Sequence, residues 1–590
     1  MSILSQPPSA KEKPDLAYIE FVADDQCKGP DGKVEGTLKL AEQQLLSEGR
    51  PRWEVIKDNK RAMLVIMIML VAIVVGGTDG TVANALVGSQ SFCKMMGAGY
   101  KNASGVYAIP PKTNTIWNAV NTPFQVKKSK ASMSAKTEAG LQVISVPVAG
   151  WLIDRIGRKY TMGIGLLIYI VAGAAQIGAQ DWRSYCVAKM CYGAAGGFSQ
   201  TASVTYVSEV VPREIRGAFL AVVPLMTTLG IFLAAFITYY CNLHWPTVDS
   251  KLGYQVPMIV VLILPVLILV LQFFTVIETP YYLLLRGKAE HAKRNMRRLY
   301  PGRSEADYAL QWAEYEYILL KEAEQKELEK GTTFLDCLKG TDLRRTFCAV
   351  LPQASQSFCG QSLIATQATY FFTLAGQKNS LKSTTISHGI GVAAYFFTAG
   401  LLEVPWLGRF RMLISGQVIM GSAMFILGAV TTRYALPYPA SVADVILFCI
   451  CLGVFGAAVG PGAAGWAYIG ESSSARLRGK TAMYGVLGNT LIGACFTTAI
   501  PYMLVDPVSG GKGGLGVNGV GFWFAAWATV MVAATVLTIP DYTGLSYAQI
   551  DELFARKVPA RRFRSTETTG DYGRDITQRS EFVDGPRGPH

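Results

Sequence analysis

Residues 206–217 read YVSEVVPREIRG and residues 468–479 read YIGESSSARLRG, so one motif occurs twice in the chain. In both copies Glu follows Tyr by three residues, and Arg-Gly begins seven residues after Glu. Each copy closes a long apolar run. A repeat across the two halves of an apolar chain is typical of a transporter built from two related helical bundles.

The composition indicates a protein that spans a membrane. Hydrophobic residues make up 50% of the chain, charged residues make up 16%, and the mean hydropathy is +0.27. A helix needs about 20 mostly apolar residues to cross a bilayer. Segments of this kind lie near 63–86, 136–153, 160–179, 184–208, 218–239, 256–277, 346–373, 385–404, 411–430, 443–470, 483–505 and 520–539. We therefore expect an all-α membrane protein whose twelve transmembrane helices form two pseudo-symmetric six-helix halves.

The placement of charge along the chain predicts the topology. The formal net charge of +13 would suit a nucleic-acid partner, but the basic residues lie at the ends of apolar segments. They cluster at Arg155, Arg158 and Lys159, at Arg213 and Arg216, in 278–345, at Arg409 and Arg411, and at Arg476, Arg478 and Lys480. This positive-inside pattern predicts cytoplasmic termini and a lipid bilayer, not nucleic acid, as the partner. Four basic residues do not fit this pattern, because they fall in the first outer loop: Lys127, Lys128, Lys130 and Lys136.

Five regions follow from this topology. We expect a cytoplasmic N-terminal tail over 1–61, an N-terminal six-helix half over 62–278, a cytoplasmic helical linker over 279–345, a C-terminal six-helix half over 346–539 and a cytoplasmic tail over 540–590. No cleavable signal peptide is expected, because the first sixty residues are polar and the first apolar segment is too long for one. In the first outer loop, Asn102-Ala103-Ser104 is an N-glycosylation acceptor sequence.

Metal, cofactor and catalytic sites are not indicated. None of the eleven cysteines has a metal-ligand spacing, and Cys449 and Cys451 lie inside an apolar segment. The four histidines are dispersed, and no Gly-rich nucleotide loop is present. We therefore expect no metal, no cofactor and no enzymatic activity.

Several motifs carry a resemblance to a known family. The stretch GWLIDRIGRK at 150–159 resembles the loop motif of the major facilitator superfamily, in particular of its sugar-porter branch. The repeated Tyr/Glu/Arg-Gly motif is similar to that branch's paired signatures, and Glu278-Thr279-Pro280 resembles the stretch that closes its sixth helix. QSFCG at 356–360, followed by Tyr370-Phe371-Phe372, looks most like fungal α-glucoside (maltose) permeases. The resemblance covers most of 60–560 and implies the fold of that superfamily and sugar transport.

Charged residues at the cytoplasmic helix ends are candidates for an inner gate. Opposite charges there can pair while the gate is shut and separate when it opens. The alternative is that these charges only fix the topology, but the repeated Glu/Arg sets favour the gate. The expected gating residues are Asp154, Arg155, Arg158, Glu209, Arg216, Arg409, Glu471 and Arg478.

Asp79 lies late in the first apolar segment, in the stretch GGTDG at 76–80. A carboxylate inside a membrane is costly unless it is paired or hydrated, which makes it a functional candidate. The resemblance implies that Asp79 is a proton-coupling site and that its partner lies on the fourth helix, where this chain has Lys189 in place of Arg. Lysine lacks the bidentate fork of arginine, so the pair would be looser. The alternative is an ion pair that only holds helices together.

Polar residues of three later helices are candidates for binding a sugar, which needs hydrogen-bonding groups and a flat apolar surface. The seventh helix carries Gln356, Gln361, Ser362 and Gln367. By resemblance, Trp466 of the tenth helix is a stacking tryptophan and Asn489 matches a polar position of the eleventh helix. Each polar residue could instead make a helix–helix hydrogen bond. Gly460-Pro461-Gly462 should break the tenth helix.

Some positions depart from the branch and leave the substrate open. Pro224 stands in the fifth helix where sugar porters have Gln, and Ser362 replaces an Asn. The leading hypothesis is a monomeric secondary transporter of a fungal plasma membrane that moves an α-glucoside such as maltose together with a proton. The alternatives are a transporter of the same fold that moves a non-sugar metabolite, either inward or outward, and a sugar sensor that does not transport.

Overall fold

The computed structural model describes a nearly all-helical chain over most of its length. The described residues are 56–96, 138–211, 213–245, 251–302, 334–375, 379–401, 408–434, 438–473, 477–504, 514–543 and 547–566, with Gln377 and a few residues between 305 and 315. Two features predicted for the first outer loop lie outside the described residues. They are the glycosylation acceptor Asn102 and the four lysines Lys127, Lys128, Lys130 and Lys136.

The helices of the first half follow the apolar segments of the sequence. They are α4 (Lys60–Leu86), α7 (Glu138–Ile156), α8 (Arg158–Gly178), α9 (Trp182–Val210), α10 (Arg213–His244) and α11 (Leu252–Thr275), and the short α5 (Gln90–Met96) follows α4. Each begins or ends within a few residues of the expected boundary. The six predicted segments of this half are therefore confirmed as helices.

The second half repeats this plan with two broken helices. Its helices are α15 (Gly340–Phe358), the π-helical turn η2 (Ser362–Thr366), α16 (Ala368–Leu374), α17 (Ser380–Leu401), α18 (Arg409–Thr432), α19 (Ala440–Val459), α20 (Pro461–Glu471), α21 (Arg478–Met503) and α22 (Gly516–Thr538). Within the described residues, eight helices are long and apolar enough to cross a membrane by composition alone. The remaining predicted segments fall on α7, α9, α15 with α16, and α17.

Both breaks occur at glycine. The seventh segment is interrupted after α15, where Gly360 has a φ of +100° that side chains rarely adopt. The predicted break of the tenth segment is confirmed, because α19 ends at Val459 and α20 begins at Pro461. At this junction the backbone of α18 comes so close that a Cβ on Gly416 would lie 2.4 Å from the Cα of Gly460.

Two hydrophobic clusters hold the bundle together. The first is confined to the N-terminal half and the start of the linker and includes Ile66, Tyr206 and Tyr300. The second joins Leu86 and Phe92 of α4 and α5 to residues of the C-terminal half such as Leu363. Burial of apolar side chains between helices thus links the two halves at the end of the bundle where α5 lies, which we call the far end.

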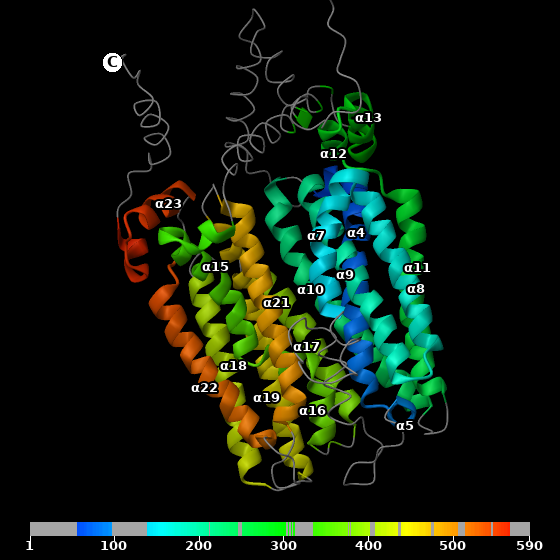
Figure 1. Cartoon of the computed structure of the whole chain (residues 1–590), viewed down its shortest axis with the longest axis vertical. Helices are drawn as coiled ribbons and strands as arrows, with labels where there is room; N and C mark the ends of the chain where they lie inside the picture. The colour runs from blue at the N-terminus through cyan, green and yellow to red at the C-terminus, as the bar shows by residue number, and fades with distance from the viewer. Residues whose placement is uncertain are drawn as a thin grey trace, which may run out of the picture.

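The opposite end, which we call the linker end, carries the short helices of the linker and the tail. These are α12 (Pro280–Leu285), α13 (Ala289–Leu299), η1 (Phe334–Leu338), α23 (Tyr547–Ala555) and η5 (Ala560–Ser565). The predicted C-terminal tail is thus helical over its first part. Figure 1 shows the two halves diverging towards this end.

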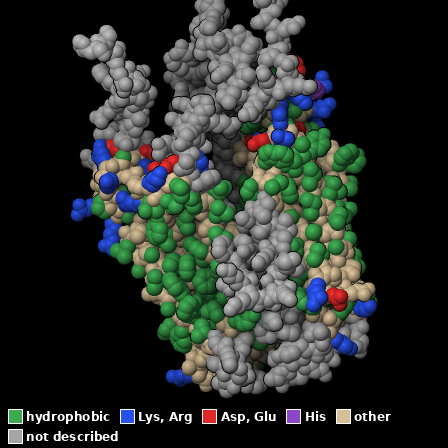
Figure 2. Space-filling view, viewed as in Figure 1, with side chains coloured by type: hydrophobic (Ala, Val, Ile, Leu, Met, Phe, Trp, Pro, Cys, Tyr) green, Lys and Arg blue, Asp and Glu red, His purple; other side chains and the backbone are tan. Residues whose placement is uncertain are grey.

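The two halves meet mainly along one pair of helices. α10 packs along α17, and Tyr395 of α17 forms a hydrogen bond with Thr228 of α10. Further towards the far end, a Cβ on Gly88 would lie 3.0 Å from Thr369 of α16. On the face of the molecule shown in Figure 2, hydrophobic side chains cover much of the described part of both halves, as expected for a surface in contact with lipid.

Candidate functional site

The candidate sugar-binding residues of the seventh segment lie around its break. Ser362 donates a hydrogen bond from Oγ to the carbonyl oxygen of Gly493 (3.2 Å), and Gln367 donates from Nε2 to that of Thr497 (3.4 Å). Both acceptors belong to α21, so these two side chains make helix–helix hydrogen bonds. Gln356 and Gln361 are half-buried, and Oε1 of Gln361 accepts no hydrogen bond from any described residue.

A fourth glutamine of this segment, Gln353, was not among the predicted site residues. Gln353 is fully buried (0% exposed), and among the described residues neither its amide nitrogen nor its amide oxygen has a hydrogen-bond partner. Its side chain lies against α20, because a Cβ on Gly465 would be 3.1 Å from its Cδ. A buried unpaired amide is costly, which marks this junction as a place where a partner is needed. Its position one turn before Gln356 was the signal available in the sequence.

The other two candidate sugar-binding residues, Trp466 and Asn489, lie on two later helices that pack against α15. α15 packs against both α20 and α21, so the three helices that carry the candidate residues are neighbours. Trp466 on α20 is 47% exposed, and Asn489 on α21 is half-buried. An exposed indole on α20 and the amides of neighbouring α15 are the kinds of group, a flat apolar face and hydrogen-bonding groups, that a sugar ring requires.

The predicted proton-coupling residues lie on two helices that pack together, α4 and α9. Lys189 of α9 is only 4% exposed, and it forms no ion pair or hydrogen bond within the described part of the chain. The side chain of Asp79 on α4 is outside the description, so the predicted pair stays a prediction. A buried lysine needs a counter-charge or water, which keeps this region a functional candidate.

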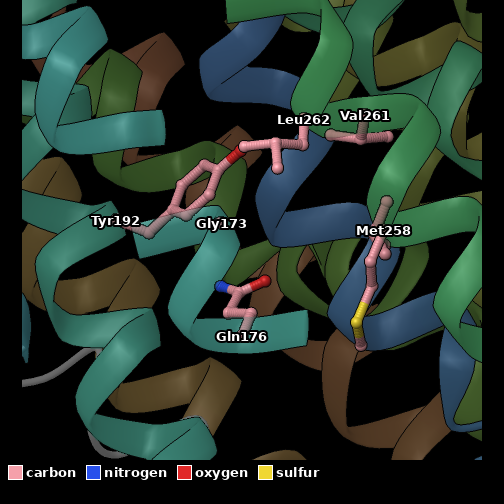
Figure 3. A pocket seen from close by; sticks show the side chains of 7 residues that line it. Gly173, Gln176, Tyr192, Met258, Val261 and Leu262 are labelled. Atoms are coloured by element: carbon pink, nitrogen blue, oxygen red, sulfur yellow. The ribbon is translucent and has the colours of Figure 1, made fainter. Parts of the chain in front are cut away.

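A small pocket adjoins the same part of the N-terminal half. Val82 of α4, Gly173 and Gln176 of α8, Tyr192 of α9 and three residues of α11 line it (Met258, Val261 and Leu262). Figure 3 shows the Gln176 amide and the Tyr192 ring among the apolar side chains of α11. The pocket lies within one half and not between the halves, so it is separate from the candidate sugar-binding residues.

At the linker end, Arg158 and Glu209 form a nearly buried ion pair. Nη2 and Nε of Arg158 lie 2.6 Å and 2.9 Å from Oε1 of Glu209, and the two side chains are 4% and 11% exposed. Thr279 donates a hydrogen bond to the other carboxylate oxygen (2.7 Å). The pair therefore ties α8 and α9 to the segment between α11 and α12, all within the N-terminal half.

Glu278, which belongs to the Glu-Thr-Pro motif but was not among the predicted functional residues, caps α8. Its carboxylate accepts hydrogen bonds from the backbone N–H groups of Arg158 (2.9 Å) and Lys159 (3.2 Å), the first residues of the helix. An anion at a helix N-terminus is stabilised by these unpaired donors. Gly157 has a φ of +99°, and a Cβ there would lie 2.4 Å from the Glu278 carboxylate. Burial nevertheless raises the pKa of the Glu278 carboxyl above its ordinary value.

The tyrosine of each motif copy makes the same contact in its own half. The Tyr206 hydroxyl donates to the carbonyl oxygen of Ile277 (2.8 Å), and the Tyr468 hydroxyl donates to that of Pro540 (3.1 Å). Both acceptors follow the last helix of a half and precede an acid, Glu278 or Asp541. The motif therefore fastens the fourth helix of each half to the chain leaving the sixth.

The N-terminus of α18 has a glycine turn like that of α8, but a threonine side chain lies against this glycine where a carboxylate lies against the other. Gly408 has a φ of +51°, and a Cβ there would lie 2.7 Å from Oγ1 of Thr543. Thr543 in turn donates a hydrogen bond to Asp541 (2.6 Å). In the first half, the acid that follows the last helix, Glu278, thus lies directly against the glycine turn. In the second half, Asp541 is linked to the glycine turn through Thr543.

The structure does not bring all the predicted gating residues together. Asp154 and Arg155 are exposed, and their backbone carbonyls accept hydrogen bonds from Arg286 of the linker (2.5 Å and 2.9 Å). The Arg155 guanidinium lies over the Trp151 ring, 4.3 Å from its centroid. Arg409 is exposed at the start of α18. The side chains of Arg216, Glu471 and Arg478 are among those not described.

Comparisons with known proteins agree with this architecture. The model of the family described as "Sugar (and other) transporter" matches residues 64–554. A maltose permease of Saccharomyces cerevisiae is 26% identical over 571 residues, which cover 94% of this chain and 86% of the permease. A general alpha-glucoside permease of the same organism is 26% identical over 456 residues, 75% of this chain and 70% of that protein.

Solved structures show the same fold. The inward-open conformation of a xylose transporter from E. coli superposes with a TM-score of 0.62 at 18% identity, covering 83% of this chain and 99% of the transporter. The structure of a proton:xylose symporter bound to 6-bromo-6-deoxy-D-glucose gives a TM-score of 0.61 at 18% identity, covering 84% and 100% of the two chains. With its two related six-helix halves and its match over 64–554, the chain belongs to the sugar (and other) transporter family, a sugar-porter branch of the major facilitator superfamily.

Proposed function

We propose that this protein moves an α-glucoside such as maltose, together with a proton, by alternating access. Membership of a transporter family is established, and relatives named as a maltose permease and a general alpha-glucoside permease match over 94% and 75% of this chain. These names motivate the substrate class. The site must then explain how a sugar is held.

The observation that carries the proposal is the broken seventh segment with its buried, unpaired amides. Gln353 and Oε1 of Gln361 lack partners among the described residues. The Gln353 side chain lies against α20, and Gln361 directly precedes η2, which packs against α21. Sugar hydroxyls both donate and accept hydrogen bonds, so they can satisfy an amide group that water or protein would otherwise have to satisfy. In this proposal Trp466 stacks on a ring face, and Gln356 and Asn489 supply further hydrogen bonds. Ser362 and Gln367 position η2 against α21.

Proton coupling is proposed for Asp79 with Lys189. Lys189 is buried without a described partner, and α4 with Asp79 packs against its helix. A carboxylate that is paired in one conformation and separated in another changes its proton affinity between them, which is what symport requires. The proton would bind Asp79 when Lys189 moves away.

The proposed transport cycle uses the linker end as the cytoplasmic gate. The repeated tyrosine contacts and the Arg158–Glu209 pair keep each half rigid, so that the halves rock as bodies about the contact between α10 and α17. Loss of those charges would loosen a half and blur the two conformations. The proposal places the protein in the plasma membrane as a monomer, with both termini in the cytoplasm.

Uptake of labelled maltose tests the proposal in host cells that lack their own carriers, with glucose and an unrelated metabolite as comparators. We expect accumulation at acid outside pH that is lost in Asp79→Asn and kept in Asp444→Asn, a matched control at an exposed acid of α19. Saturable maltose entry without accumulation, unaffected by pH or by Asp79→Asn, would contradict proton coupling but would leave maltose transport in place. No uptake of any sugar, with surface expression verified, would overturn the sugar proposal.

A second candidate is transport of a non-sugar metabolite by the same cycle. Pro224 occupies the position in α10 where sugar porters present an amide, and its carbonyl accepts a hydrogen bond from Thr228 (2.9 Å). This face of α10 therefore offers a sugar one hydrogen-bonding side chain fewer. Saturable uptake or export of the unrelated metabolite, with no effect of added maltose on it, would favour this candidate.

A further inference from the structure

The C-terminal helices α23 and η5 form a basic surface that is fixed to the linker end of the C-terminal half. Phe554 and Phe563 are buried against each other with their ring centroids 5.1 Å apart. The Arg344 guanidinium of α15 lies 5.3 Å and 5.6 Å from these two rings. Arg345 forms an ion pair with Asp551 of α23. The cations that follow α23 are therefore held in place by the transmembrane bundle and do not sit on a free tail.

Exposed apolar side chains place this surface at the boundary of the membrane. Leu343 and Phe347 lie one turn apart on α15 and are 49% and 46% exposed, as expected for side chains in lipid. Between them in the sequence, Arg344 donates a hydrogen bond to the carbonyl oxygen of Val558 (2.8 Å). Val558 thus contacts Arg344, the residue that follows the exposed Leu343 in the sequence of α15. η5 also packs against α22, whose Leu537 is exposed near its end.

Three of the cations on this surface have no acidic partner in the part of the chain that is described. Lys557, Arg561 and Arg562 are exposed and form no ion pair there. The neighbouring cations do have partners, since Arg556 pairs with Glu552 and Arg564 lies 3.9 Å from Asp541. Figure 2 shows Lys and Arg side chains gathered around α23 and η5, directly above the hydrophobic surface of the C-terminal half.

Lys557 also has an unusual backbone. Its φ of +54° makes it the only described residue other than glycine with a positive φ. It ends α23 with two hydrogen bonds, from Lys557 N to Phe554 O (3.0 Å) and from Val558 N to Leu553 O (3.1 Å). Helices usually end this way at glycine, because a side chain disfavours the conformation. These hydrogen bonds fix the backbone at Lys557, so the position of this cation on the surface is set by the end of α23.

We propose that Lys557, Arg561 and Arg562 form a headgroup site for an anionic phospholipid in the leaflet at the linker end. Cations beside a lipid-facing helix attract negatively charged headgroups, and guanidinium groups bind phosphate oxygens through paired hydrogen bonds. A zwitterionic lipid offers no net charge to this surface. The site holds α23 and η5 against α15 from the lipid side.

Native mass spectrometry of the purified full chain in detergent tests the proposal, with titration of dioleoyl phosphatidylserine and dioleoyl phosphatidylcholine. We expect phosphatidylserine to bind more tightly than phosphatidylcholine. We expect Arg561→Gln with Arg562→Gln to weaken phosphatidylserine binding by about fivefold for each arginine removed. Arg561→Lys with Arg562→Lys should keep most of the preference, because the charge remains.

The matched control is Arg294→Gln with Arg298→Gln, two exposed arginines of α13. It removes the same net charge away from α23 and η5, so the preference should be unchanged. Equal binding of phosphatidylserine by the wild type and the Arg561/Arg562 variant would overturn the proposal, as would an equal loss in the α13 control. Displacement of phosphatidylserine by excess inorganic phosphate would also overturn it, because the site would then bind free anions. The unfolding temperature of each variant shows whether the fold is kept.

Discussion

The hydroxyl of Tyr206 donates a hydrogen bond to the carbonyl oxygen of Ile277 at 2.8 Å, across 71 residues of sequence. Tyr468 makes the equivalent contact with Pro540 at 3.1 Å in the other half. The most visible repeat in the sequence is therefore a pair of equivalent fastenings. Each anchors the fourth helix of its half to the chain that leaves the sixth.

These two contacts predict similar effects of removing either hydroxyl. Tyr206→Phe and Tyr468→Phe should each lower the free energy of unfolding by about 1–3 kcal/mol, because a buried carbonyl loses its donor. Thermal unfolding of the purified protein in detergent measures the effect. Tyr160→Phe, at an exposed tyrosine of α8, is the control and should change nothing. An effect in one half only would show that the two contacts are not equivalent.

Removing Arg158 should damage the protein more than removing Arg155. Arg158→Ala leaves the nearly buried Glu209 without its cation, at an expected cost of about 3–5 kcal/mol. Arg155 is exposed, and its guanidinium lies over Trp151, so Arg155→Ala should cost less than about 1 kcal/mol. Unfolding temperature and surface expression distinguish the two variants. Equal losses would mean that the Arg158–Glu209 pair is not what holds α8 to α9.

Glu278 should give the protein a specific pH dependence. Desolvation by burial is the largest effect on its pKa and raises it above 4.5, against the backbone N–H groups of Arg158, Thr279 and Lys159, which lower it. A carboxyl with a raised pKa contributes stability that is full below the unfolded value and is lost as the pH rises through the folded value. The unfolding temperature of the wild type should therefore fall with pH from 4.5 upward more steeply than that of Glu278→Gln. Glu290→Gln, at an exposed acid of α13, should follow the wild type; identical profiles for all three would refute the prediction.

The contact between α4 and α10 should not tolerate a methyl group. A Cβ on Gly230 would lie 2.2 Å from the carbonyl oxygen of Val74, and backbone atoms of a packed helix cannot turn aside. We expect Gly230→Ala to lower the free energy of unfolding by about 1–3 kcal/mol and to reduce surface expression. Gly150→Ala provides the control, because nothing lies within 4 Å of the added carbon. Normal expression and stability of Gly230→Ala would show that the two helices can move apart.

Trp466 should contribute to substrate affinity and not to stability. Its indole is 47% exposed on α20, the helix that packs against α15. Trp466→Ala should raise the KM for the transported sugar by about tenfold through loss of stacking. Trp523→Ala, at a tryptophan of α22 that is 43% exposed, should leave KM unchanged. Uptake kinetics over a range of sugar concentrations decide between them, and an unchanged KM in Trp466→Ala would remove this residue from the site.

The sequence predicted the helices well because the signals for them are local. Runs of apolar residues long enough to cross a bilayer mark the helices wherever they occur, and all twelve predicted segments fall on helices of the structure. Gly460 and Pro461 end one helix and begin another for reasons that lie in those residues alone. The break of the seventh segment at Gly360 was not predicted, since a glycine there can also continue a helix.

Only the tertiary structure decided how the polar residues are used. It paired Arg158 with Glu209 inside one half, placed the Glu278 carboxylate at the start of α8, and left Asp154 and Arg155 exposed. It also engaged Ser362 and Gln367 with α21 while leaving Gln353 buried without a described partner. A hydrogen bond needs two groups brought within about 3 Å of each other, and residues far apart in sequence meet only through the packing of whole helices. Hydropathy along the chain thus determined the transmembrane architecture, and helix packing determined which charges and amides are available for function.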